Sequence, residues 1–184
     1  MGKTTFAISF TRKLAEKGHK ICYLTLGEDK DKWLEKYAMG DTSGNGVYAS
    51  IEIVDEVPQA VDDIEKIIQG GDPDLLIVDY LQLIDRGEGD VKTVEKSLAA
   101  LADKYSLPVM VLSQLGRQIE KRKDHKPKVE DLDSIGLDSE LYDQVFLLYR
   151  KHYYFLEAAE SDLLVILKDR EEQLIWDYPS LSVL

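Results

Sequence analysis

Residues 75–80 read Leu75-Leu76-Ile77-Val78-Asp79-Tyr80, an apolar run that ends in a carboxylate. A strand buried on both faces has this continuous pattern, whereas a strand with one wet face alternates apolar and polar residues. Shorter apolar runs occur at 21–26 and 109–112, and residues 50–54 are also typical of a strand. These segments predict the inner strands of a sheet that is covered by helices.

Helical patterns separate the predicted strands. Apolar residues recur at helical spacing in 4–17, in the stretch that begins at Val61 and in 92–105, and residues 30–39 form a shorter candidate helix. Strands that alternate with helices imply crossover connections, so the predicted fold class is α/β with a mostly parallel, twisted sheet flanked by helices. Such sheets bind ligands beyond the carboxyl ends of their strands.

The second half of the chain has a different pattern. Residues 114–135 are charged and lack apolar periodicity, which predicts a long loop. Strands are predicted at 145–149, 163–167 and 174–176, the last two as an antiparallel pair at the C-terminal end. Because no repeat or domain boundary is visible, residues 1–184 are predicted to form a single domain.

Composition excludes several classes of protein. The formal net charge of −12 argues against a generally nucleic-acid-binding surface, although a local basic loop can still occur. No apolar run approaches the roughly 18–20 residues that span a bilayer. Cys22 is the only cysteine, so an internal disulfide is excluded, and the three histidines show no zinc-ligand spacing. We therefore expect a cytoplasmic protein with no membrane partner.

Gly2-Lys3-Thr4, directly before a predicted helix, matches the end of the phosphate-loop pattern Gly-x-x-x-x-Gly-Lys-[Ser/Thr]. In that loop, backbone N–H groups at a helix N-terminus face a polyphosphate. The lysine contacts the β and γ phosphates, and the hydroxyl binds Mg²⁺. Lys3 and Thr4 have the side chains for these roles. The first glycine and the strand before the loop are absent from the sequence, and a plain helix start explains the three residues better when they are taken alone.

Two polar strand ends strengthen the phosphate-loop interpretation. Asp79 ends its strand where a Walker B aspartate would hold water on Mg²⁺, although a turn aspartate is an equally good reading by itself. Ser113-Gln114 ends the next predicted strand, where an amide could sense a γ-phosphate; a polar strand terminus is the plain alternative. The order of these elements along the chain favours a nucleotide site.

Several of these motifs resemble the DnaB-type replicative helicase family. Asp79-Tyr80-Leu81-Gln82-Leu83-Ile84 is similar to the family's Walker B signature, and residues 107–117 resemble its sensor strand. Met1–Ala7 is similar to the end of its phosphate loop, Asp131-Leu132 with Gly136 and Asp143 to the segment after its DNA loop, and Lys168-Asp169-Arg170 to its Lys-x-Arg finger. The resemblance spans nearly the whole chain.

The resemblance implies a RecA-like P-loop NTPase core in a homo-hexameric ring that translocates on single-stranded DNA, with a primase or a helicase loader as a further partner. It implies that ATP lies between subunits, that Glu28 and Gln114 act in catalysis within one subunit, and that Lys168 and Arg170 reach the γ-phosphate of the next. The implied ligands of ATP are Gly2, Lys3, Thr4, Thr5 and Asp79, with Mg²⁺ on Thr4 and Asp79, and the implied contacts to DNA are Arg117, Lys121, Arg122 and Lys123.

The sequence also departs from the family's pattern. The phosphate loop is incomplete, Glu28 is displaced by one residue from the family's catalytic glutamate, and Glu171-Glu172 follow Arg170. A one-residue shift within a strand would turn Glu28 away, whereas a loop after the strand could re-aim it. Three functions therefore stay open: a helicase motor, a catalytically degenerate DnaB-like protein, and a recombinase-type RecA-fold ATPase. The Asp-Tyr-Leu-Gln-Leu run favours the first two.

Overall fold

The computed structural model describes residues 2–39, 50–56, 58, 60–84, 90–155, 162–167 and 174–177. The chain divides into two compact units, one of residues 4–114 and one of residues 1–3 with 115–184. The single domain expected over residues 1–184 stays a prediction. Among the described residues, no helix is long and apolar enough to cross a membrane.

The first unit is built on a four-stranded parallel sheet. The strands are β1 (Ile21–Thr25), β2 (Ile51–Val54), β3 (Leu75–Asp79) and β4 (Val109–Leu112), in the order β2-β1-β3-β4. Every residue of β1 and β3 is buried, as the unbroken apolar runs predict. In the register of these two strands Thr25 lies opposite Asp79, so both strands end at the same edge.

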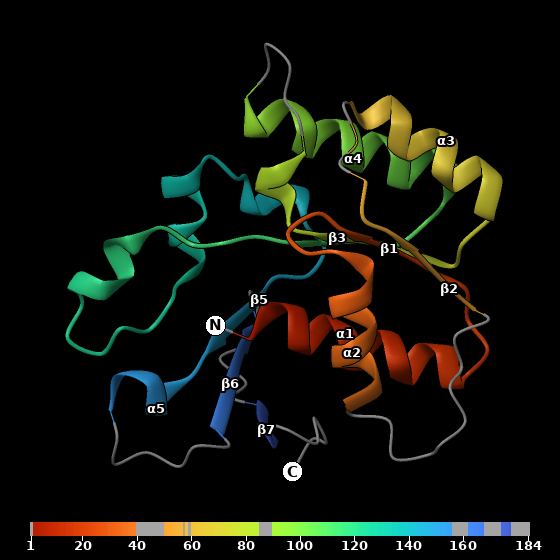
Figure 1. The fold of residues 1–184 in the computed structure, drawn as a ribbon. Coiled ribbons are helices and arrows are strands. Elements are labelled where there is room, and N and C mark those ends of the chain that lie inside the picture. The colour runs from red at the N-terminus through yellow and green to blue at the C-terminus, as the bar shows by residue number, and fades with distance from the viewer. Residues whose placement is uncertain are drawn as a thin grey trace. The chain divides into compact units, whose positions relative to one another are not determined.

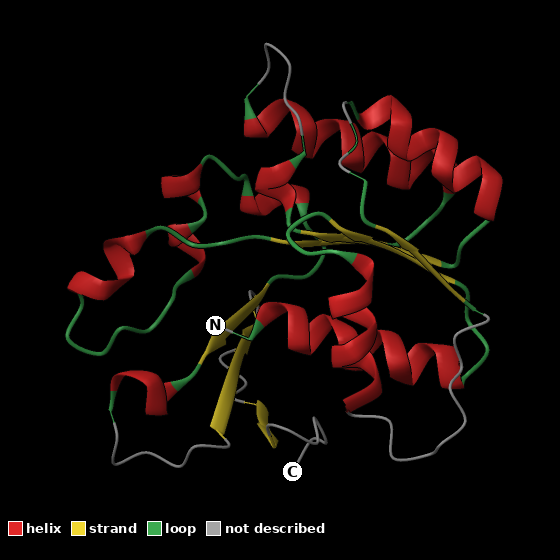
Figure 2. Ribbon diagram, viewed as in Figure 1, coloured by secondary structure: helices red, strands yellow, loops and turns green. Residues whose placement is uncertain are grey.

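Helices cover both faces of this sheet. Helices α1 (Lys3–Glu16) and α2 (Lys30–Met39) lie on one face, and α3 (Val61–Gly71) and α4 (Val91–Tyr105) lie on the other (Figure 1). In Figure 2 the red helices lie on both sides of the yellow strands of this sheet. The predicted α/β class with a parallel sheet flanked by helices is confirmed.

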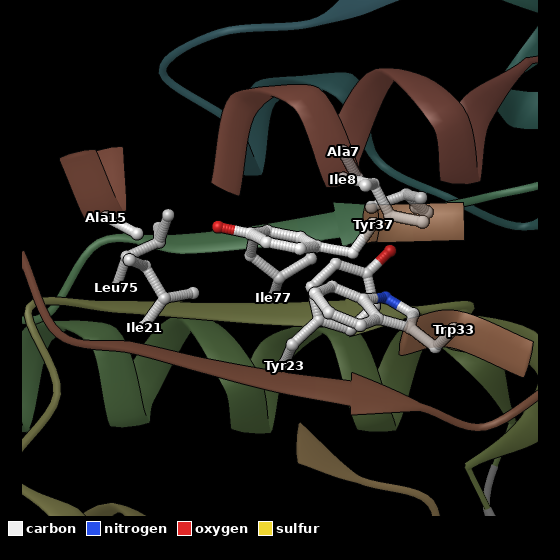
Figure 3. Close-up of a cluster of buried hydrophobic side chains, with 10 residues drawn as sticks. Ala7, Ile8, Ala15, Ile21, Tyr23, Trp33, Tyr37, Leu75 and Ile77 are labelled. Carbon is white, nitrogen blue, oxygen red and sulfur yellow. The ribbon is translucent and has the colours of Figure 1, made fainter. Parts of the chain in front are cut away.

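An aromatic group fills the space between the sheet and the helices α1 and α2 (Figure 3). Trp33 and Tyr37 are four residues apart, so they share one face of α2. The ring of Trp33 stacks on Tyr37 with a centroid separation of 5.3 Å and meets Tyr23 of β1 edge-on at 4.8 Å. All three side chains are fully buried, which fixes α2 against the end of β1.

The second unit contains a three-stranded antiparallel sheet of β5 (Phe146–Tyr149), β6 (Asp162–Leu167) and β7 (Leu174–Asp177). The short helix α5 (Lys151–Tyr154) follows β5. The stretch predicted as a long loop contains three short 3-10 helices, η2 (Arg117–Lys121), η3 (Val129–Asp131) and η4 (Asp133–Ile135). The prediction missed them because one-turn helices are too short to show apolar periodicity.

Candidate functional site

A cavity of about 240 Å³ opens at the edge of the first unit where β1 and β3 end. The parallel sheet places ligand sites at this edge. Its lining comes from the first turn of α1, the turn after β1, helix α2 and the end of β3. The lining residues are Thr4, Thr25, Gly27, Glu28, Lys36, Asp79 and Tyr80.

Asp79 supplies the carboxylate at the end of β3 and is only 5% exposed. The Tyr23 hydroxyl donates a hydrogen bond to Asp79 Oδ2 at 2.8 Å. Burial, and then the charge of Asp79, raises the pKa of Tyr23 well above its ordinary value, so the hydroxyl stays a donor. The backbone N–H of Leu26 donates to the Asp79 carbonyl at 2.7 Å, which ties the turn after β1 to the end of β3.

Thr4 lies in the first turn of α1, where the backbone N–H groups have no partner within the helix. Its place in the cavity lining with Asp79 combines a hydroxyl and a carboxylate, the oxygen ligands that Mg²⁺ prefers. The donor set therefore fits the predicted magnesium site. Gly2 and Lys3 precede Thr4 and Thr5 follows it; their roles as nucleotide ligands stay predictions.

Glu28 lines the same cavity. Strand β1 ends at Thr25, so the alternation of a strand no longer governs the direction of the Glu28 side chain. The hydroxyl of Thr25 donates to the Glu28 carbonyl at 3.1 Å and shapes this turn. The one-residue displacement in sequence therefore leaves Glu28 facing the cavity.

The Glu28 carboxylate has two different environments. Oε2 forms an ion pair with Lys36 Nζ from α2, and the Glu28 side chain is 17% exposed. Oε1 is buried and has no hydrogen-bond partner among the described residues. A carboxylate held at one oxygen can accept a proton or a hydrogen bond at the other.

Tyr80 lies close to Gly27, and both residues line the cavity. A Cβ added at Gly27 would be 3.1 Å from the Tyr80 ring, a separation tighter than most real contacts. Glycine at position 27 therefore lets the turn after β1 approach the end of β3.

Gln114 lies in the described part of the chain but is not among the residues that line this cavity. Gln82, from η1 (Leu81–Leu83), donates to Ser113 Oγ at 2.6 Å and to the Gln114 carbonyl at 3.4 Å. The Gln114 side chain is exposed. Its role as a phosphate sensor stays a prediction.

The basic segment after Gln114 divides into two kinds of residue. Arg117, Lys121 and Lys123 are exposed. Arg122 is partly buried and forms a two-pronged ion pair with the buried Asp131. Three of the four predicted DNA contacts thus face solvent, while Arg122 holds the loop together. Lys168 and Arg170 lie outside the described residues.

Sequence reasoning did not assign four of the lining residues to the site: Thr25, Gly27, Lys36 and Tyr80. It also missed Tyr23, the hydrogen-bond partner of Asp79. Tyr23 carries a hydroxyl among the apolar neighbours Ile21, Cys22 and Leu24, which was an available signal. Lys36 carries no signal of its own in a helix rich in lysine.

Two solved structures share the fold of this chain. The chain superposes on the structure described as the ATPase domain of G40P with a TM-score of 0.80 and 24% identity, over 95% of this chain and 75% of that one. A KaiC-like protein of Pyrococcus horikoshii gives a TM-score of 0.66 at 19% identity, over 96% of this chain and 77% of that one.

The chain belongs to the DnaB-like helicase C terminal domain family, whose model matches residues 48–175. It is 33% identical over 143 residues to the replicative DNA helicase DnaB of Geobacillus stearothermophilus, covering 71% of this chain and 30% of that protein. It is 27% identical over 195 residues to a probable plasmid replicative DNA helicase of Chlamydia psittaci, covering 88% of this chain and 43% of that protein. The chain thus spans less than half the length of these relatives.

A further solved structure is described as a DnaB-like replicative helicase and its interactions with primase. It gives a TM-score of 0.80 at 24% identity, over 95% of this chain and 51% of that one. The family membership confirms the DnaB-type resemblance and gives no support to the recombinase-type alternative.

Proposed function

We propose that the chain is the motor domain of a DnaB-type replicative helicase that binds ATP with Mg²⁺ and moves along single-stranded DNA during DNA replication. The observation that carries the proposal is the shared cavity of Thr4, Glu28 and Asp79 at the carboxyl edge of a parallel sheet. Membership of the DnaB-like family implies nucleotide binding, which supports a nucleotide as the ligand of this cavity.

The polar residues in and beside the cavity have separate roles in this proposal. The first turn of α1 presents backbone N–H groups and its dipole to the phosphates, with Lys3 beside them. Thr4 and Asp79 would hold Mg²⁺, which neutralises charge on the phosphate oxygens when it is bound. Glu28 Oε1 accepts a hydrogen bond from the attacking water. Tyr23 fixes the orientation of the Asp79 carboxylate.

The proposed assembly is the one that the DnaB-type resemblance implies. The domain works in the cytoplasm as a homo-hexamer in which Lys168 and Arg170 act on the nucleotide of a neighbouring subunit, while Gln114 reports the γ-phosphate within its own. Exposed Arg117, Lys121 and Lys123 contact DNA phosphates. A primase or a helicase loader is the proposed protein partner, since one similar solved structure is described with primase.

ATP hydrolysis by the 184-residue chain, with and without single-stranded DNA, tests the proposal. We expect hydrolysis that DNA stimulates and that Thr4→Ala, Lys3→Ala and Asp79→Asn each abolish. Asp29→Asn is the matched control, because Asp29 is an exposed carboxylate one residue after Glu28. Hydrolysis that is absent from the unmodified chain, or that survives Asp79→Asn, contradicts the enzyme reading.

A catalytically degenerate DnaB-like protein is the second candidate. The observation in its favour is the Glu28–Lys36 ion pair, which occupies one oxygen of the carboxylate that would act on water. This candidate predicts that the chain binds a fluorescent ATP analogue with Mg²⁺, that Asp79→Asn weakens the binding, and that no hydrolysis occurs. Both candidate functions therefore predict nucleotide binding, and only the helicase motor predicts ATP hydrolysis.

A further inference from the structure

The second unit carries a group of stacked aromatic rings on its surface. We define the aromatic cluster as His125, Tyr149, Tyr153, Tyr154 and Phe155. Tyr154 is its centre: His125 stacks on it with a centroid separation of 4.4 Å, Tyr149 stacks at 5.9 Å, and Tyr153 meets it edge-on at 5.0 Å. Phe155 lies against His125 at 5.9 Å.

The outer members of the aromatic cluster face solvent. Tyr153 is 60% exposed and Phe155 is 38% exposed, and both are among the few exposed large hydrophobic side chains of the described residues. Burying such a ring is favourable, so two exposed rings in adjoining positions, at the end of α5 and directly after it, are candidates for contact with a ligand. The partly buried stack of His125, Tyr149 and Tyr154 supports the exposed rings.

The aromatic cluster is joined to the basic loop, defined as residues 117–128. His125 belongs to this loop, and the Tyr149 hydroxyl donates to the carbonyl of Asp124 at 2.7 Å. The loop contains six basic and two acidic residues in a chain whose net charge is −12. Lys121 and Lys123 are exposed within it. The aromatic cluster is thus in contact with a loop that carries exposed ammonium groups.

We propose that this surface binds single-stranded DNA through its bases as well as its phosphates, with Tyr153 as a stacking platform and Lys121 and Lys123 as phosphate contacts. The inference rests on the proposed function and deepens it by adding base stacking to the phosphate contacts. Proteins that bind single strands without reading sequence combine a basic surface with aromatic rings on which bases stack. Charge complementarity favours a polyanion over a protein surface as the occupant.

The test measures binding of the full chain to a labelled oligothymidine of about 12 nucleotides, within the site sizes known for such surfaces. An abasic strand of the same length, which keeps every phosphate, is the matched ligand. We expect Tyr153→Ala to lower the affinity for oligothymidine about tenfold and to leave the affinity for the abasic strand unchanged. The salt dependence of binding also stays the same, because no phosphate contact is lost. Tyr153→Phe retains full affinity, because stacking needs the ring and not the hydroxyl.

Lys123→Ala provides the opposite control. It weakens binding to both strands equally and lowers the slope of log affinity against log salt by about 1. Circular dichroism verifies that each variant is folded. If Tyr153→Ala does not fold, Phe155→Ala tests the second exposed ring in its place. Unchanged affinity of a folded Tyr153→Ala for oligothymidine, or an equal loss on both strands, overturns the stacking platform.

Two further outcomes separate the alternatives. If Tyr153→Ala leaves DNA affinity intact but lowers the mass of the particle in light scattering, the rings are covered by another copy of the chain, which also overturns the inference. If the unmodified chain binds neither strand at low salt, the DNA part of the proposed function fails as well. If DNA binding depends on Lys123 but not on Tyr153, the stacking inference is wrong and the proposed function is unaffected.

Discussion

The hydroxyl of Tyr23 donates a hydrogen bond to Asp79 Oδ2 at 2.8 Å between two adjacent parallel strands. In the register of β1 and β3, Tyr23 lies opposite Ile77, two residues before Asp79, so the two side chains project from the same face of the sheet. A buried carboxylate without partners would be costly, and the phenol supplies a donor that stays protonated.

Tyr23→Phe removes this hydroxyl and keeps the ring. We expect the free energy of unfolding to fall by about 1–3 kcal/mol, because a buried charged acceptor loses a donor. Urea denaturation measures the change. Tyr105→Phe is the matched control, since the Tyr105 hydroxyl bonds to Glu65 on the outer helices and has a smaller effect where water can replace it. Equal losses of unfolding free energy in the two variants would show that the hydrogen bond to Asp79 stabilises the fold no more than the one to Glu65.

Cys22, next to Tyr23 on β1, makes the stability of the sheet depend on pH in the alkaline range. Burial, and then the charge of Glu52, raises the pKa of its thiol from 9.0 to about 12. The thiol's contribution to stability is fully present below pH 9 and is lost as the pH rises toward 12, since only the unfolded thiol ionises in that window. We expect the unfolding free energy of the unmodified chain to fall more steeply above pH 9 than that of Cys22→Ala, with parallel curves below it. Parallel curves up to pH 11 would contradict the shift.

The sequence predicts much of the first unit because its signals are local. The apolar runs at 21–26 and 75–80 identify the inner strands, and the places of Thr4 and Asp79 follow from the edge at which parallel strands end. The contact between Tyr23 and Asp79 depends on strand register, and the pair of Glu28 and Lys36 depends on the shape of a turn, neither of which has a sequence signal. The sequence does not distinguish Arg122 from the basic residues beside it, because charge alone does not show which cation has a buried partner.

Arg122 therefore differs from Lys121 in its expected effect on stability. The Arg122 guanidinium bonds to Asp131 and to the Lys126 carbonyl, and it holds the pKa of Asp131 below its ordinary value of 3.8. We expect Arg122→Ala to lower the unfolding free energy by about 2 kcal/mol at pH 7, because it leaves a buried carboxylate with fewer donors, and Lys121→Ala to change it by less than about 0.5 kcal/mol.

The pH dependence of the unfolding free energy distinguishes the ion pair of Arg122 and Asp131 from a packing effect of Arg122. A lowered pKa contributes stability that is present above the ordinary value and is lost as the pH falls below it. The difference in unfolding free energy between the unmodified chain and Arg122→Ala is therefore full at pH 7 and shrinks on acidification below about 4. A difference that persists unchanged at pH 2 would indicate that Arg122 acts through packing instead.

Lys36 is expected to position Glu28 during hydrolysis without binding nucleotide. Its ammonium holds Oε2, so Lys36→Met frees the carboxylate to rotate and moves Oε1 away from the attacking water. We expect kcat to fall about ten- to hundredfold. The affinity for a fluorescent ATP analogue stays unchanged, and Lys36→Arg restores most of the rate because it keeps a cation on Oε2. Lys32→Met, which removes an exposed lysine paired with Asp29 on the same helix, is the control and leaves both quantities unchanged. A loss of nucleotide affinity in Lys36→Met that matches the loss of rate would mean that this lysine contacts the phosphates directly, and the positioning role would then be wrong.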